Sequence, residues 1–66
     1  MTNYCEVDLT PLKESESGKA WLCDVGLEEP IWLPASQFET PPDKDDLDRM
    51  ACFELTNFIC REKGLI

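Results

Sequence analysis

The densest group of side chains that could carry chemistry is a run of aspartates, Asp43, Asp45, Asp46 and Asp48. Calcium prefers oxygen ligands, so the run has to be compared with a calcium-binding loop. An EF-hand loop beginning at Asp43 would place Leu47 where a ligand is needed and Asp48 where the loop needs glycine. The run therefore does not predict an EF-hand, and we expect no metal site in this chain.

Nucleophilic or metal chemistry would otherwise depend on the four cysteines, Cys5, Cys23, Cys52 and Cys60. The chain has no histidine to activate a thiol or to complete a ligand set, and the cysteines are too widely spaced for a paired zinc motif. We therefore expect no catalysis, no zinc and no cofactor. An even number of cysteines in a small domain is compatible with a disulfide. Because the first residues do not resemble a secretory signal, four reduced thiols are the main expectation.

The excess of acidic residues is the clearest indication of function in the sequence. Fourteen acidic residues outnumber six basic ones, which gives a formal net charge of −8. Such a charge repels nucleic acids and anionic membranes, and it favours basic partners and accelerates their association. We expect the partner to be a basic, nucleic-acid-binding protein, with no direct contact to nucleic acid or membrane. Solubility alone is the alternative explanation, and charge does not separate the two.

The spacing of two carboxylates invites comparison with DNA. Glu6 and Asp8 are two residues apart, which is about 6.6 Å along a strand. Two phosphate steps along one strand of B-DNA measure about the same distance. The aspartate run would extend such a row. The pair Glu28 and Glu29, which follows Gly26, is the second choice for a partner contact. The predicted partner-binding residues are Glu6, Asp8, Glu28, Glu29, Asp43, Asp45, Asp46 and Asp48.

The first elements that would position these residues are predicted strands. The segment 3–10 alternates polar and apolar side chains, as a half-buried strand does, and Pro11 should weaken or bend it. Segments 19–25 and 31–34 each carry a tryptophan and are separated by a connection of hairpin length. These features predict a small antiparallel sheet. The proline-containing segment 40–49 is expected to be an acidic loop or a short helix.

The C-terminal third predicts a strand followed by a helix. Residues 51–55 have the pattern of a fourth strand, and Thr56 is a suitable N-cap for a short helix over 57–63 that ends before Gly64. The predicted fold class is α+β, with a small curved antiparallel sheet of three to four strands and one short C-terminal helix. We expect residues 1–66 to form a single small acidic domain.

The predicted core consists of apolar side chains on the inward faces of these elements. One of the two tryptophans should be buried with them. The predicted core residues are Val7, Leu9, Leu22, Ile31, Leu33, Phe53, Leu55, Phe58 and Ile59.

Three stretches carry a resemblance: residues 19–22, with the sequence KAWL; residues 31–37, IWLPASQ; and residues 58–66, FICREKGLI. Together they resemble small acidic proteins of phages and other mobile elements. By size and acidity the chain is also similar to anti-CRISPR proteins, several of which are acidic nucleic-acid mimics. The resemblance implies a monomeric, non-catalytic inhibitor of a bacterial CRISPR–Cas complex, acting as a DNA mimic in the cytoplasm of the bacterial host.

An alternative function is that of a phage accessory protein that binds a protein partner through an exposed aromatic face. Tyr4 with an exposed Trp21 or Trp32 would supply the anchors, since aromatic side chains dominate interface hot spots. Such binding should respond little to salt, whereas that of a DNA mimic should weaken as ionic strength rises.

Overall fold

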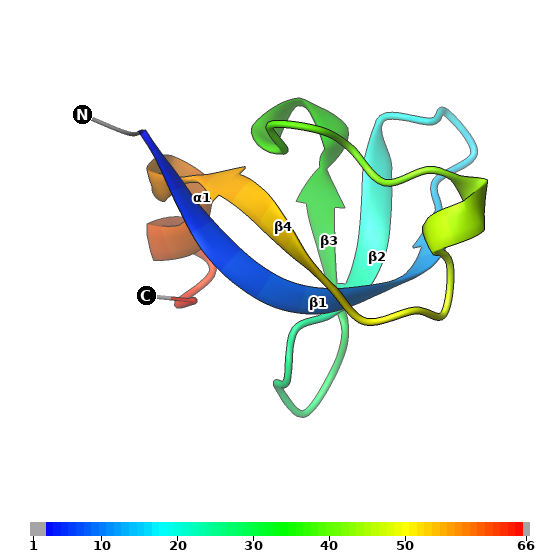
Figure 1. Cartoon of the computed structure of the whole chain (residues 1–66), viewed down its shortest axis with the longest axis horizontal. Helices are drawn as coiled ribbons and strands as arrows, with labels where there is room; N and C mark the ends of the chain where they lie inside the picture. The colour runs from blue at the N-terminus through cyan, green and yellow to red at the C-terminus, as the bar shows by residue number, and fades with distance from the viewer. Residues whose placement is uncertain (1–2, 66) are drawn as a thin grey trace.

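The computed structural model describes residues 3–65 and has the predicted α+β fold. Its four strands form one antiparallel sheet with the order β3-β2-β1-β4, and a short helix follows the last strand (Figure 1). Two 3₁₀ turns lie in the connection between β3 and β4. The bounds in chain order are β1 (Tyr4–Glu14), β2 (Ala20–Asp24), β3 (Ile31–Pro34), η1 (Ala35–Gln37), η2 (Lys44–Asp46), β4 (Ala51–Thr56) and α1 (Asn57–Glu62).

The long strand β1 organises the sheet because its two halves have different partners. Residues 4–9 pair with β4, and residues 10–14 pair with β2. The register with β2 shifts between Pro11 and Lys13, since proline has no N–H to donate to a ladder. The predicted disturbance at Pro11 is therefore present, but the strand continues to Glu14 instead of ending there.

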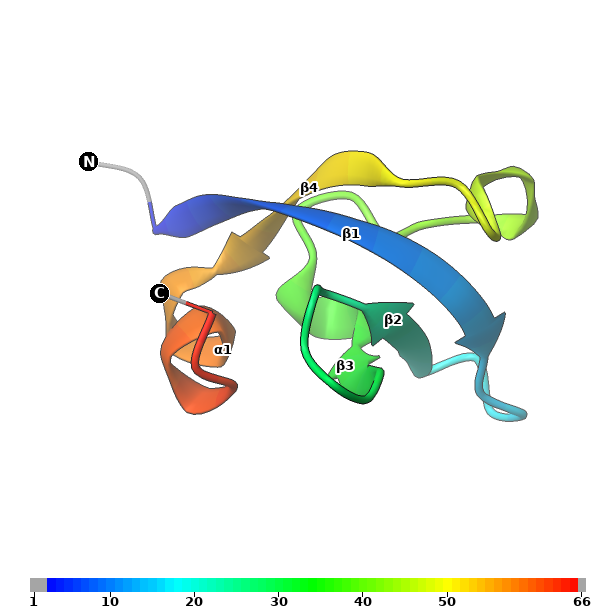
Figure 2. The same ribbon diagram turned by 90° about the horizontal axis from the view of Figure 1, so that it is seen from below.

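The chain beyond β3 returns to the outer edge of β4, so the curved sheet nearly closes on itself. Phe38 forms a β-bridge with Leu55. The next backbone N–H, that of Glu39, donates to the carbonyl oxygen of Glu54 at 2.9 Å. Figure 2 shows the chain after η1 beside β4, and α1 follows the C-terminal end of that strand. The connection thus brings the side chains after η1 next to those of β4.

The core lies on the concave side of the sheet and confirms much of the prediction. Leu9, Leu33 and Leu55 are fully buried and Ile59 nearly so. Three further predicted residues are partly buried against them: Val7, Ile31 and Phe53. The remaining buried hydrophobic side chains are Trp21, Cys23, Phe38 and Cys60.

Two predicted core positions are wrong. Phe58 is 65% exposed, because α1 turns Ile59 and Cys60 toward the sheet and leaves residue 58 outside. Leu22 is only half-buried, since it lies opposite the exposed Trp32 on the outer face of the β2–β3 pair. Trp21 lies opposite Leu33 on the inner face, so one tryptophan is buried, as predicted, and the two are on opposite faces.

The ends of α1 follow the sequence signals. The Thr56 hydroxyl accepts a hydrogen bond from the Ile59 N–H at 3.2 Å, which makes it the N-cap. The same hydroxyl donates to the side-chain oxygen of Gln37, which ties the start of the helix to η1. Gly64 has a φ of 72° and follows the last helical turn, a conformation that glycine adopts without strain.

The expectation of four free thiols is wrong for one pair. Cys5 of β1 and Cys60 of α1 are joined in a disulfide, while Cys23 and Cys52 are free. The helix packs its inward side against the end of β1, which brings two small inward-facing side chains together. Because 55 residues separate the two cysteines, their spacing in the sequence carried no sign of this contact.

The disulfide predicts the number of reactive thiols. Alkylation of the denatured protein without reductant should give two adducts per chain, on Cys23 and Cys52, and prior reduction should give four. Mass spectrometry of the intact chain distinguishes the two results. Four adducts without reductant would show that Cys5 and Cys60 are not bonded.

The buried Cys23 thiol predicts a loss of stability at alkaline pH. Burial raises its pKa from 9.0 to about 11, because the thiolate would lose its hydration. The folded state therefore holds this proton more tightly than the unfolded state, and the resulting stability is present below pH 9 and lost as pH rises toward 11. Between pH 8 and pH 10.5, the urea midpoint of Cys23→Ala should fall less than that of the wild type. An equal fall in both proteins would contradict the prediction.

Candidate functional site

The outer face of the β1–β4 pair places acidic side chains directly opposite one another. Glu6 lies opposite Glu54, and Asp8 lies opposite Cys52. All four side chains are exposed, since their neighbours along each strand point into the core. Directly opposed side chains in an antiparallel pair are close neighbours, and like charges in this position are destabilising. The fold thus keeps a repulsive carboxylate pair on the exposed outer face of β1 and the edge strand β4.

Glu39 extends this group from the connection beside β4. Its backbone is hydrogen-bonded to that of Glu54, and its carboxylate acts on the pKa of Tyr4. Hydrogen bonding to the Glu39 carboxylate, together with the negative charges of Glu39 and Glu54, raises the pKa of Tyr4. Carboxylates from three neighbouring segments therefore share one surface. We call Glu6, Asp8, Glu39 and Glu54 the acidic face.

The paired parts of β1 and β4, residues 4–9 and 51–56, contain no basic side chain that could neutralise the acidic face. Segments 3–12 and 50–60, which contain the paired region, have neither lysine nor arginine. Desolvation raises the pKa of Cys52, and the negative charges of three carboxylates raise it further; these are Glu6, Asp8 and Glu54. The thiol therefore lies in a region of negative potential and stays protonated at neutral pH.

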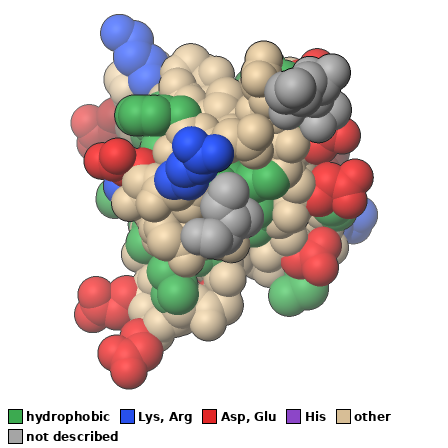
Figure 3. Space-filling model, turned by 90° about the vertical axis from the view of Figure 1, so that its left-hand side faces the viewer, with side chains coloured by type: hydrophobic (Ala, Val, Ile, Leu, Met, Phe, Trp, Pro, Cys, Tyr) green, Lys and Arg blue, Asp and Glu red, His purple; other side chains and the backbone are tan. Residues whose placement is uncertain are grey.

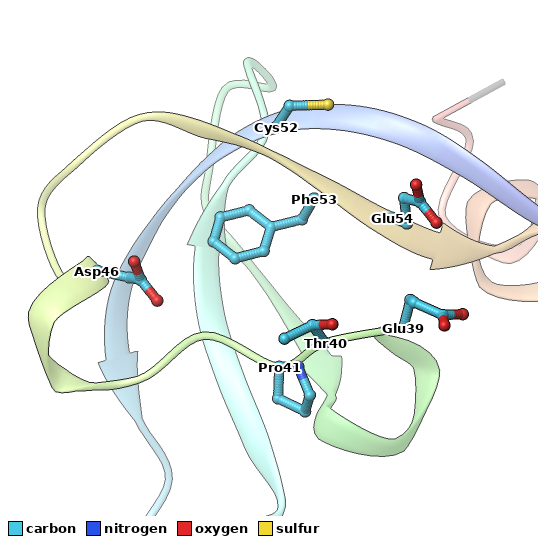
Figure 4. Close-up of a pocket in the computed structure, with 7 residues that line it drawn as sticks. All are labelled: Glu39, Thr40, Pro41, Asp46, Cys52, Phe53 and Glu54. Carbon is cyan, nitrogen blue, oxygen red and sulfur yellow. The ribbon is translucent and has the colours of Figure 1, made fainter.

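A cleft of about 510 Å³ adjoins the acidic face, between β4 and the segment that leads to η2 (Figure 4). In the close-up the Phe53 ring points from β4 into this space, with Glu39 and Glu54 at one end and Asp46 at the other. Phe38 packs edge-on against Phe53, with ring centroids 5.8 Å apart. The lining residues are Glu39, Thr40, Pro41, Asp46, Cys52, Phe53 and Glu54.

The eight predicted partner-binding carboxylates do not form one site. Glu6 and Asp8 lie on the acidic face, where the predicted strand alternation put them. Glu28 and Glu29 lie in the β2–β3 connection, which projects away from η2 in Figures 1 and 2. Of the aspartate run, Asp46 lines the cleft beside the acidic face.

The aspartate run mainly shapes its own loop. The Asp43 carboxylate accepts from the Asp45 N–H at 2.8 Å, and the Asp46 carboxylate accepts from the Asp43 N–H at 2.9 Å, which closes a capping box on η2. Asp48 has a φ of 60°, and its N–H donates to the carbonyl oxygen of Pro11 at 2.8 Å. Short polar side chains are favoured in such turns, which explains much of the aspartate content here.

The exposed large apolar side chains belong to different segments of the chain. The aromatic ones are Tyr4, Trp32 and Phe58, at 37%, 43% and 65% exposure. Figure 3, which faces the end of the molecule carrying α1, shows hydrophobic side chains separated by polar and charged ones. Isolated exposed apolar residues are normal on soluble domains. That view therefore offers no continuous aromatic surface for docking.

Within residues 3–65, no group of three or more cysteine, aspartate or glutamate side chains is arranged to hold a metal ion. In the same part of the chain, no helix has both the length and the apolar character that crossing a membrane requires. Comparisons of the chain with protein-family models, with curated proteins and with solved structures found no match.

The acidic face predicts the reactivity of Cys52. Because nearby carboxylates hold the pKa of this thiol up, Glu54→Gln and Glu6→Gln should each lower the pKa and speed alkylation of Cys52 at pH 8, by roughly twofold or more. Rates are measured by peptide mapping of the folded protein, which follows Cys52 apart from the other cysteines. Glu28→Gln is the matched control and should leave the rate unchanged. Equal rates in all four proteins would mean that these carboxylates do not act on the thiol.

Proposed function

We propose that this protein is a non-catalytic inhibitor that occupies a basic nucleic-acid-binding groove of a partner protein and thereby excludes DNA. The observation that carries the proposal is the acidic face, in which Glu6 and Glu54 oppose each other and the paired segments 4–9 and 51–56 contain no basic residue. The repulsion between these two carboxylates weakens the sheet locally. A partner that supplies positive charge would remove this repulsion and explain why the pair is present.

The geometry of the acidic face supports binding in place of DNA. Carboxylates on one strand are about 6.6 Å apart, and those directly across the ladder about 5 Å apart. The spacing along one strand of the sheet corresponds to two phosphate steps of DNA, whose charges recur at about 3.4 Å of axis per strand. A groove lined with lysine and arginine for DNA would therefore meet a comparable density of negative charge.

The resemblance to anti-CRISPR proteins makes a DNA-targeting CRISPR effector the first partner to test. Such an effector holds nucleic acid in a positively charged channel. The alternative, docking of an aromatic face, receives less support, since the exposed aromatic side chains belong to three different elements, β1, β3 and α1.

The test compares two variants with equal net charge. The face variant carries Glu6→Gln, Asp8→Asn, Glu39→Gln and Glu54→Gln. The control carries Glu16→Gln, Glu28→Gln, Glu29→Gln and Glu62→Gln at exposed positions elsewhere. Each variant loses four negative charges, so the net charge changes from −8 to −4 in both. A difference between them therefore reports position and not total charge.

The wild type should displace a labelled DNA duplex from a purified effector, measured by fluorescence anisotropy, and rising salt should weaken the displacement. The control should inhibit nearly as well. The concentration of the face variant needed to displace half of the DNA should rise tenfold or more. Each exposed charge pair contributes up to ~1 kcal/mol, and four are removed. Equal inhibition by both variants would contradict the role of the acidic face. A panel of DNA-targeting effectors of which none is displaced would contradict the CRISPR assignment.

A further inference from the structure

We propose that the cleft beside β4 receives an arginine side chain of the partner, with the guanidinium group stacked on the Phe53 ring. The inference rests on the proposed function and names the contact that would anchor the partner on the acidic face. The cleft shares Glu39 and Glu54 with that face, so one bound partner would reach both.

The cleft combines an aromatic surface with negative charge. Phe53 is only half-buried, and its ring points into the cleft (Figure 4). The edge-on contact with the buried Phe38 holds this ring in place. A fixed aromatic ring in a shallow recess is suited to a flat, weakly hydrated cation, and guanidinium is the one that protein side chains supply.

Carboxylates lie at both ends of the cleft. Glu39 and Glu54 lie at one end of the cleft and Asp46 at the other. They do not converge as a metal site in the described part of the chain. Guanidinium presents five N–H donors in one plane, so it can donate to a carboxylate at one end of the cleft while its face stacks on the ring; a lysine ammonium has no flat face to stack. This geometry favours arginine over lysine.

The second cleft of the molecule provides a contrast. It measures about 520 Å³, and its lining includes Lys44 together with Glu14, Asp43 and Asp45. The buried Trp21 contributes to this lining, but it is 3% exposed and offers little ring surface to a ligand. The cleft beside β4 has no basic side chain in its lining, and its aromatic ring is accessible. Charge complementarity therefore selects the cleft beside β4 for a cation.

The first experiment uses N-acetyl-arginine methylamide as a probe, titrated into ¹⁵N-labelled protein and followed by amide chemical shifts. Shifts should concentrate at residues 39–41, 46 and 52–54, and the lysine analogue should bind at least threefold more weakly. Phe53→Leu should weaken the arginine probe fivefold or more. Phe58→Leu, which removes an exposed ring on α1, should have no effect. Diffuse shifts over all acidic residues, or equal binding of both probes, would overturn the proposal.

Glu54→Gln provides a second variant in case Phe53→Leu perturbs the fold, since residue 54 is exposed and the change keeps its shape. It should weaken the arginine probe threefold or more, with Glu28→Gln as the matched control. A Glu54→Gln protein that binds the probe as the wild type does would also overturn the proposal.

The DNA-displacement assay separates this inference from the proposed function. Phe53→Leu keeps every charge, so it should reduce inhibition severalfold only if an arginine occupies the cleft. Full inhibition by Phe53→Leu, together with loss in the face variant, would overturn the cleft proposal and leave the proposed function standing. Cleft binding of the probe without displacement of DNA by the wild type would overturn the proposed function and leave only the cleft chemistry.

Discussion

The pairing of β1 with two different strands is the constraint on which the structure depends. One half of β1 is fixed by β4 and the other by β2, with the register shift after Pro11 between them. Slipping a strand by one residue exchanges its faces, which would expose the fully buried Leu9 and bury Asp8. Burial of the small core therefore determines which carboxylates face solvent, and the acidic face follows from the same register that protects the core.

A chain of this size has little stability to spare, so the repulsive pair of Glu6 and Glu54 is informative. Outward strand positions tolerate many polar residues, and a lysine at either position would convert repulsion into attraction. The Thr56 cap and the contact between Phe38 and Phe53 show that the sequence follows favourable local rules nearby. Departures from such rules in an otherwise consistent fold tend to mark functional surfaces.

The sequence predicted the elements better than their mutual contacts. The alternation over 3–10, the proline that ends β3 and the cap at Thr56 are local signals, and each corresponds to an observed feature. Glu54 could be assigned to an outward position from its neighbours, but its contact with Glu6 depends on a register between segments almost fifty residues apart. The burial of Phe38 and the position of Glu39 likewise depend on the return of the chain to the edge of β4, and the disulfide depends on the packing of α1 against β1. No local sequence pattern predicts these contacts.

Density of charge along the chain is a poor guide to density of charge in space. Asp43 and Asp46 are close in the sequence, but their carboxylates accept backbone N–H groups of their own loop, which leaves less of each for a partner. The carboxylates of Glu6 and Glu54 are far apart in the sequence and are held side by side by a hydrogen-bonded ladder. A rigid ladder loses little conformational freedom when a partner binds. The Asp43 and Asp46 carboxylates, in contrast, already hold the backbone of their own loop in place. The acidic face, and not the aspartate run, is therefore the better candidate for the proposed contact with a basic groove.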